Sequence, residues 1–236
     1  MQERDSDLFK SDGLTEQSGE IRVAVSERYA DFIDSFDPGM EDELEDLYRE
    51  ARSEDIPVIR RHTISLLRFL IKTNKPENIL EIGTAVGFSA LLMNSYQPEG
   101  GHITTIENYE KRIPRAKENF CRFGKEDSIE LIEGDALKIT EMLPKAKYDM
   151  VFMDGAKGQY ITLLPAIKRL LKSGGILISD NVLSDGQIVE SRYAVERRNR
   201  TIHKRMREYL FALTHDDELV TTILSDGDGV ALSYRL

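Results

Sequence analysis

Two carboxylates and one amide follow two short apolar segments of the chain, where they could bind a metal ion. Asp154 comes directly after the run 148–153, and Asp180 and Asn181 come directly after the run 175–179. If both runs are parallel strands, their carboxyl ends meet at the same edge of a sheet. Carboxylate and amide oxygens suit Mg²⁺, whereas zinc prefers histidine or thiolate ligands. We therefore predict a Mg²⁺ site with open positions for water or substrate. Either aspartate taken alone could instead cap a loop.

Lys157 lies three residues after Asp154, within reach of a substrate oxygen bound to such a metal. A lysine ammonium loses its proton more readily beside Mg²⁺ and away from water, because both effects lower its pKa toward the range of a general base. We therefore predict that Lys157 is the catalytic base. A solvent-exposed surface lysine is the ordinary alternative.

A glycine turn over residues 83–87 links a predicted strand to a predicted helix. Ligands of open parallel sheets bind at such turns, but the three-glycine pattern of a pyrophosphate site is absent. Glu107 ends the second strand, 24 residues after Gly83, where it could accept hydrogen bonds from both ribose hydroxyls of an adenosine. Asp135 and Ala136 follow the third strand and could contact the adenine. The glycines alone would indicate an ordinary turn, but the three strand ends together predict an adenosine-containing cofactor.

The elements that must position these residues alternate after Pro76 between short apolar runs and helical stretches. This alternation predicts an α/β fold with a Rossmann-like, doubly wound and mostly parallel sheet. The last two runs, 219–224 and 230–234, predict an antiparallel hairpin at the sheet edge. The expected strands are 78–82, 102–107, 128–134, 148–154 and 175–179, and the expected helices are 88–95, 113–123, 139–143, 163–171 and 195–213.

Three further helices are expected before this core, over residues 21–36, 41–53 and 58–72. Residues 1–20 are polar and lack apolar periodicity, which predicts a disordered acidic tail. We therefore expect a single domain over residues 21–236, in which N-terminal helices (21–75) precede the α/β core (76–236).

The net charge of −10 is unevenly distributed, because residues 1–57 carry −12 and the other 179 residues carry +2. On a helix over 195–213, the apolar side chains gather on one side and four cations fall within an arc of roughly 80° on the other. Such a cationic arc predicts contacts to nucleic-acid phosphates, although a solvated charged face is the usual explanation. The four cations are Arg197, Arg200, Lys204 and Arg207.

The single cysteine excludes an internal disulfide, and the four histidines lack metal-ligand spacing. No apolar run approaches the ~20 residues of a membrane span, and the N-terminus lacks the pattern of a secretory signal. We therefore expect a cytoplasmic protein without a membrane partner.

Three motifs occur in the order EIGTAVGFS (81–89), MDGAKGQY (153–160) and SDNVL (179–183). The first resembles the S-adenosylmethionine site of class I methyltransferases. Together they resemble the Mg²⁺-dependent catechol and caffeoyl-CoA type O-methyltransferases over roughly residues 25–236. The resemblance implies that the metal is held by Asp154, Asp180 and Asn181, that Lys157 is the base, and that the protein is a homodimer. It also implies that S-adenosylmethionine contacts Val58, Ser89, Glu107 and Ala136. Together with the strand ends, the predicted cofactor contacts also include Gly83, Asp135 and Asp154.

Within this family, the sequence looks most similar to bacterial tRNA 5-hydroxyuridine methyltransferases. It shares their AKGQY loop, a DNVL motif before a basic helix, and a Gly-Asp-Gly before the final strand. The resemblance implies methylation of 5-hydroxyuridine to 5-methoxyuridine in the anticodon loop of tRNA, at the wobble position. Two alternatives stay open: a catechol-type enzyme with small-molecule acceptors, and a non-catalytic RNA-binding protein on the same scaffold.

Overall fold

The computed structural model describes residues 28–29, 32–184, 186–225 and 227–236 of the 236-residue chain. The chain divides into two units, residues 1–39 and 40–236. In the first unit, the described residues 28, 29 and 32–34 are helical, and Phe32 packs edge-to-face on Phe36. The predicted tail over 1–20 and most of the predicted helix 21–36 lie outside the described residues. The single domain over 21–236 therefore stays a prediction.

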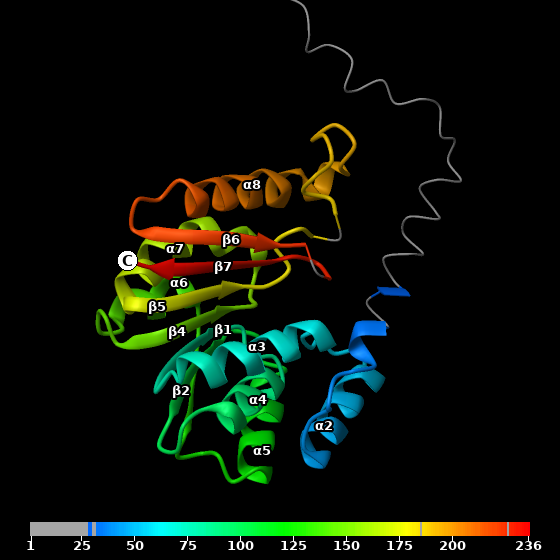
Figure 1. Cartoon of the computed structure of the whole chain (residues 1–236), viewed down its shortest axis with the longest axis vertical. Coiled ribbons are helices and arrows are strands. Elements are labelled where there is room, and N and C mark those ends of the chain that lie inside the picture. The colour runs from blue at the N-terminus through cyan, green and yellow to red at the C-terminus, as the bar shows by residue number, and fades with distance from the viewer. Residues whose placement is uncertain (1–27, 30–31, 185, 226) are drawn as a thin grey trace, which may run out of the picture. The chain divides into compact units, whose positions relative to one another are not determined.

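The second unit is built on one seven-stranded sheet in the order β3-β2-β1-β4-β5-β7-β6 (Figure 1). The first five strands are parallel, and β7 runs antiparallel to both β5 and β6. The predicted doubly wound sheet with a C-terminal hairpin is therefore confirmed. The strands are β1 (Asn78–Ile82), β2 (His102–Glu107), β3 (Ile129–Glu133), β4 (Tyr148–Met153), β5 (Leu171–Ser179), β6 (Leu219–Leu224) and β7 (Val230–Arg235).

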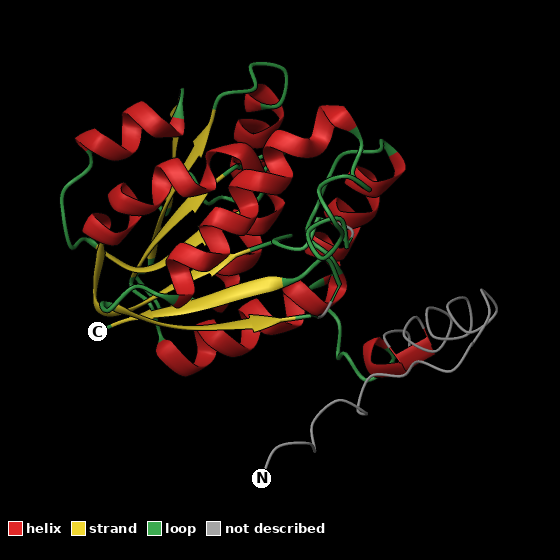
Figure 2. Cartoon of the chain, turned by 90° about the horizontal axis from the view of Figure 1, so that it is seen from above, coloured by secondary structure: helices red, strands yellow, loops and turns green. Residues whose placement is uncertain are grey.

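Helices cover both faces of this sheet (Figure 2). Consecutive strand residues point to opposite faces, so Ile79 of β1 joins one hydrophobic cluster and Leu80 joins the other. Both faces are buried, which explains why the central strands carry apolar residues at consecutive positions. The helices are α2 (Asp42–Ser53), α3 (Arg61–Asn74), α4 (Phe88–Tyr96), α5 (Ile113–Arg122), α6 (Ala136–Met142), α7 (Tyr160–Leu170) and α8 (Arg200–Thr214).

The predicted start of the last helix at Val195 is wrong, because α8 begins at Arg200. Val195 is buried, but it packs from a loop that precedes a short 3₁₀ turn over Arg197–Asn199. Apolar periodicity reports burial and not backbone conformation, so the loop residue extended the predicted helix.

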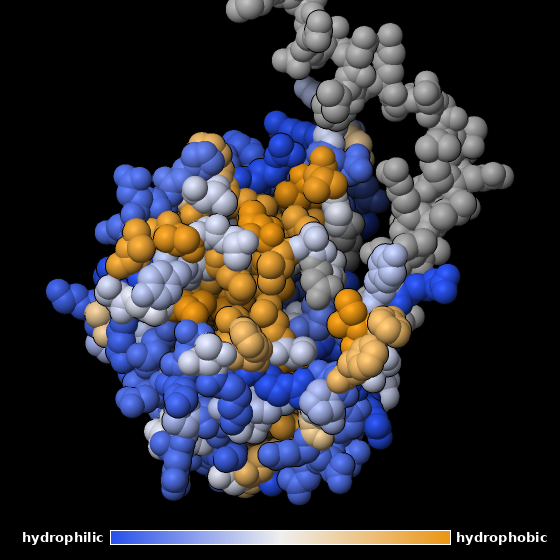
Figure 3. Space-filling model, viewed as in Figure 1, coloured by the Kyte–Doolittle hydropathy of each residue, from blue (hydrophilic) through white to orange (hydrophobic). Residues whose placement is uncertain are grey.

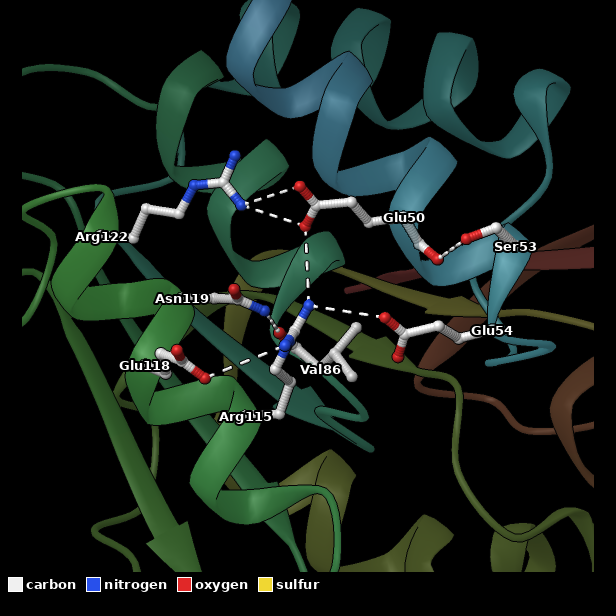
Figure 4. Close-up of polar contacts among 8 residues, drawn as sticks. All are labelled: Glu50, Ser53, Glu54, Val86, Arg115, Glu118, Asn119 and Arg122. Atoms are coloured by element: carbon white, nitrogen blue, oxygen red, sulfur yellow. Dashed lines mark hydrogen bonds and ion pairs between the residues drawn. The ribbon is translucent and has the colours of Figure 1, made fainter.

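Polar contacts join α2 to α5 on one side of the sheet (Figure 4). Glu50 accepts contacts from Arg122 at 3.0 Å and from Arg115 at 3.6 Å. These side chains are about 40% exposed, so each pair contributes at most about 1 kcal/mol. The buried Asn119 of α5 instead donates a hydrogen bond to the Val86 carbonyl at 2.8 Å. Asn119 of α5 therefore holds the turn between β1 and α4 in place.

On the face drawn in Figure 3, hydrophobic side chains gather over the C-terminal strands. Among the exposed hydrophobic residues of these strands are Val220 of β6 and its cross-strand partner Tyr234 of β7. None of the described helices is long and apolar enough to cross a membrane.

Candidate active site

A cavity of about 440 Å³ lies at the carboxyl ends of the parallel strands. This volume is within the usual range of small-molecule sites. Of the predicted cofactor residues, Val58, Gly83, Ser89, Glu107, Ala136 and Asp154 line it, together with Lys157 and Asn181.

Asp135 is not among the lining residues. Its carboxylate accepts a hydrogen bond from the Leu137 N–H at 3.0 Å and so caps the N-terminus of α6. The structure thus shows a capping role for Asp135 where the sequence suggested an adenine contact. The adjacent Gly134 and Ala136 form this part of the wall.

Gly83 is required by the backbone geometry at the end of β1. Its φ is +99°, and a Cβ at this position would lie 2.5 Å from the Asp154 carbonyl oxygen. Only glycine therefore lets the end of β1 approach the end of β4 this closely. The contact brings the glycine turn beside Asp154, the predicted metal ligand.

The Glu107 carboxylate binds two turns at once. One oxygen accepts from the N–H groups of Thr84 at 3.2 Å and Ala85 at 2.8 Å. The other accepts from those of Asn108 at 2.9 Å and Tyr109 at 2.8 Å. Glu107 therefore holds the glycine turn against the end of β2, in addition to facing the cavity. The sequence did not predict this second role.

Glu81 is a further buried acid of the site that sequence analysis missed. It accepts a hydrogen bond from the Thr105 hydroxyl at 2.5 Å, and its other oxygen has no partner among the described residues. Burial raises the pKa of Glu81 to about 7, although hydrogen bonds from Ser89 and Thr105 oppose the rise. The sequence did contain a signal for this residue, because Glu81 is the one acid in the otherwise largely apolar strand β1. Its contact with Ser89 places it directly behind the cavity wall.

The predicted metal ligands come together at the ends of β4 and β5. The Asp180 N–H donates to the Met153 carbonyl at 2.9 Å, next to Asp154. Burial raises the pKa of both aspartates, and the charge of Asp180 raises that of Asp154 further. Asn181 adopts a positive φ of 55° and donates its N–H to the Asp180 carboxylate.

Two buried carboxylates that repel each other are an arrangement that a bound cation would stabilise. The described residues contain no group of three or more histidine, cysteine or acidic side chains that could hold a metal. Two carboxylates and the Asn181 amide would therefore leave positions for water or substrate oxygens. This donor set fits Mg²⁺.

Lys157 begins a short 3₁₀ turn after β4, and its Nζ lies 3.4 Å from the carboxylate of the buried Asp228. Arg205 of α8 holds the same turn by donating to the Gly158 carbonyl at 2.9 Å. Asp228 sits in the Gly-Asp-Gly turn, whose carbonyls accept hydrogen bonds from Val182 and Leu183. The sequence indicated this segment as the turn of the C-terminal hairpin and as a family motif, but it predicted no role for Asp228. The structure shows that it supplies the partner of Lys157.

The four cations of the predicted phosphate-binding arc do not form one stripe on a helix. Arg197 lies outside α8, in the 3₁₀ turn before it. Arg200 donates to the Val195 carbonyl at 3.1 Å, and Arg207 donates to the Ile188 carbonyl at 3.0 Å. Lys204 lies 3.5 Å from Glu208 on the exposed face. Two of the four therefore hold the loop between β5 and α8.

The strand order and the cavity at the strand ends define a Rossmann-like methyltransferase. Residues 38–236 match the model of the family described as O-methyltransferase. The chain therefore belongs to the O-methyltransferase family.

Several relatives are named after small acceptors. Caffeoyl-CoA O-methyltransferase 2 of Populus trichocarpa is 32% identical over 180 residues, which cover 72% of this chain and 71% of the relative. Catechol O-methyltransferase of Niastella koreensis is 30% identical over 52% of this chain and 58% of its own length. A Staphylococcus aureus structure, provisionally named a caffeoyl-CoA O-methyltransferase, is 30% identical with a TM-score of 0.78. It covers 94% of this chain and 100% of its own.

Proposed function

We propose that this protein transfers the methyl group of S-adenosylmethionine to one of two vicinal oxygens on a planar small-molecule acceptor, with Mg²⁺ bound beside the acceptor. One observation carries the proposal. A single cavity places the ribose-binding candidate Glu107 at one part of its wall and Asp154, Lys157 and Asn181 at another. Relatives named for catechol and caffeoyl-CoA point to the same acceptor chemistry.

In this proposal the two parts of the cavity wall bind different parts of the methyl donor. Glu107 and Ala136 lie where strands β2 and β3 end and would bind the adenosine. Val58 and Ser89 would bind the methionine portion. The described cavity residues are largely apolar or uncharged around these acids, as is common in cofactor sites.

Asp154, Asp180 and Asn181 would hold the metal through their side-chain oxygens. A hydroxyl chelated by Mg²⁺ has a lowered pKa, and this is the chemistry that the bound metal supplies. Lys157 accepts the hydroxyl proton at Nζ. Asp228 then lies next to the ammonium and keeps the side chain at the cavity wall. Gly83 and Glu107 keep the cofactor turn beside these groups.

Methylation of 5-hydroxyuridine in tRNA is the second candidate, because cations remain exposed near the site. Arg197 and Lys204 are both exposed on or next to α8. The 5-hydroxyl and 4-carbonyl oxygens of this base are vicinal, as are the two oxygens of a catechol. A base in a single-stranded loop can be turned outward into such a pocket.

We expect the purified protein to convert catechol to 2-methoxyphenol in the presence of S-adenosylmethionine and Mg²⁺, as measured by mass spectrometry. Excess EDTA should abolish the product, and Mg²⁺ should restore it. Asp154→Asn and Asp180→Asn should each lower kcat by about 10²-fold or more while the protein stays folded. Asp127→Asn is the matched control, because Asp127 is exposed and lies outside the cavity. Full activity in EDTA would refute the metal site.

A further inference from the structure

A second pocket of about 160 Å³ lies beside Lys157. It is formed by the segment that follows β5 and by the beginning of α8. Lys157 lines both this pocket and the larger cavity, so it is the residue at which the two spaces meet. The other lining residues are Ser184, Gln187, Ile188, Asn199, Ile202 and His203.

Two buried polar atoms of this lining have no hydrogen-bond partner among the described residues, namely Ser184 Oγ and His203 Nδ1. His203 is only 4% exposed. Its Nε2 lies 3.1 Å from the Glu190 carbonyl, which can only accept, so Nε2 carries a proton and, in the neutral ring, Nδ1 presents a lone pair. A buried polar atom without a partner is rare and costs stability. A bound group that donates a hydrogen bond would give these atoms a partner.

The pocket has the size and the walls for one six-membered ring. A cavity of about 150 Å³ is large enough for benzene. Ile188 and Ile202 supply apolar wall, while the amides of Gln187 and Asn199 pair with each other at 3.2 Å. The lining atoms that remain for hydrogen bonds to a ligand are therefore Ser184 Oγ and His203 Nδ1.

The loop over this pocket is held in place by α8. Three side chains of α8 contact backbone carbonyls of the loop. The contacts are Arg200 with the Val195 carbonyl, His203 with the Glu190 carbonyl, and Arg207 with the Ile188 carbonyl. Arg205 secures the Lys157 turn from the same helix. The pocket is therefore preorganised, which reduces the entropic cost of ligand binding.

We propose that this pocket binds the acceptor ring and selects rings that carry a third polar group, an O–H or N–H donor, next to the vicinal oxygens. His203 Nδ1 accepts from that donor, and the Ser184 hydroxyl, which can donate as well as accept, pairs with the same group or with the neighbouring ring oxygen. The inference rests on the proposed methyl transfer. Pyrogallol has this pattern in its three adjacent hydroxyls, and a 5-hydroxyuracil ring has it in O5, O4 and N3–H.

The test compares two rings of similar size, pyrogallol and 3-fluorocatechol, which differ in the third donor. Calorimetry with Mg²⁺ and S-adenosylhomocysteine gives the ratio of their dissociation constants, and methylation kinetics give the ratio of their KM values. We expect the wild-type protein to favour pyrogallol. Ser184→Ala and His203→Gln should each reduce this preference about three- to tenfold, as expected when one hydrogen bond is removed. Comparing ratios cancels the different acidity of the two rings.

His203→Asn is the matched control for His203→Gln. The glutamine amide can keep a donor toward the Glu190 carbonyl but removes the acceptor at the place of Nδ1. The asparagine oxygen can replace Nδ1 but does not reach Glu190. We therefore expect His203→Asn to keep most of the preference, and Ser184→Ala carries the test if a His203 variant does not fold.

An unchanged preference in folded Ser184→Ala and His203→Gln would overturn the inference, even if both rings are methylated. A preference that depends on His203, measured by binding without any methyl transfer, would support the pocket and refute the proposed function. Failure of the wild-type protein to bind either ring while it still binds S-adenosylhomocysteine would overturn both.

Discussion

Glu107 combines a structural role with the proposed recognition of ribose. Its four backbone hydrogen bonds use both carboxylate oxygens, so the cofactor turn depends on its charge and shape. We expect Glu107→Gln to weaken S-adenosylmethionine binding about 10- to 100-fold, which corresponds to roughly 1.5 to 3 kcal/mol for a charged hydrogen bond. The melting temperature should also fall, because the glutamine NH₂ would face two N–H donors.

Calorimetry and thermal melting measure the two effects separately. Glu133→Gln serves as the control, since Glu133 ends β3 but is exposed and, among the described residues, forms an ion pair only with Lys117. Unchanged cofactor affinity in folded Glu107→Gln would show that Glu107 only supports the turn.

At the scale of elements, the cations on α8 and in the 3₁₀ turn before it have different roles. Arg200 and Arg207 hold the loop over the acceptor pocket, whereas Arg197 and Lys204 form no hydrogen bond with the described part of that loop. Replacing all four residues together would therefore disturb the loop and any phosphate contacts at the same time. Arg200 with Arg207, and Arg197 with Lys204, should therefore be replaced in two separate variants.

We expect Arg200→Ala with Arg207→Ala to raise the KM for catechol, because the loop loses two anchors. Arg197→Ala with Lys204→Ala should leave catechol kinetics unchanged. If tRNA is the acceptor, this second variant should bind tRNA more weakly, and its log-log salt slope should fall by up to about one unit for each phosphate that the variant no longer binds. Binding of tRNA at the wild-type affinity across a salt titration would exclude a phosphate role for Arg197 and Lys204.

At the scale of the whole molecule, the methyltransferase unit is residues 40–236. Both hydrophobic clusters and the cavity at the strand ends are formed within this unit. We expect a chain shortened to residues 40–236 to keep the melting temperature and the S-adenosylmethionine affinity of the full chain. Unfolding of the shortened chain would instead support a single domain that begins at residue 21.

The homodimer implied by the family resemblance stays a prediction. Light scattering on the full and shortened chains would measure it in the same experiment. A mass of about twice 26.9 kDa is the expected result for the full chain.

The sequence by itself determined the fold class and the edge of the sheet at which the site lies. The bounds predicted for β1, β2 and β6 agree with the structure, because buried strands are short apolar runs that end at turn residues. Parallel strands then place their carboxyl ends together. For this reason Gly83, Asp154 and Asn181, although far apart in the chain, were correctly expected in one neighbourhood.

Only the tertiary structure decided which partner each polar side chain has. Lys157 and Asp228 are 71 residues apart, and no periodicity relates them. Asp135 caps α6, although its position after β3 had suggested a contact with adenine. Arg200 and Arg207 donate to loop carbonyls, although the cationic arc had suggested contacts with phosphates. His203 is buried on the apolar side of α8, and its Nδ1 has no partner among the described residues. Hydrophobic patterns specify which residues leave water, but hydrogen bonds depend on atomic distances and directions that arise only when distant segments pack.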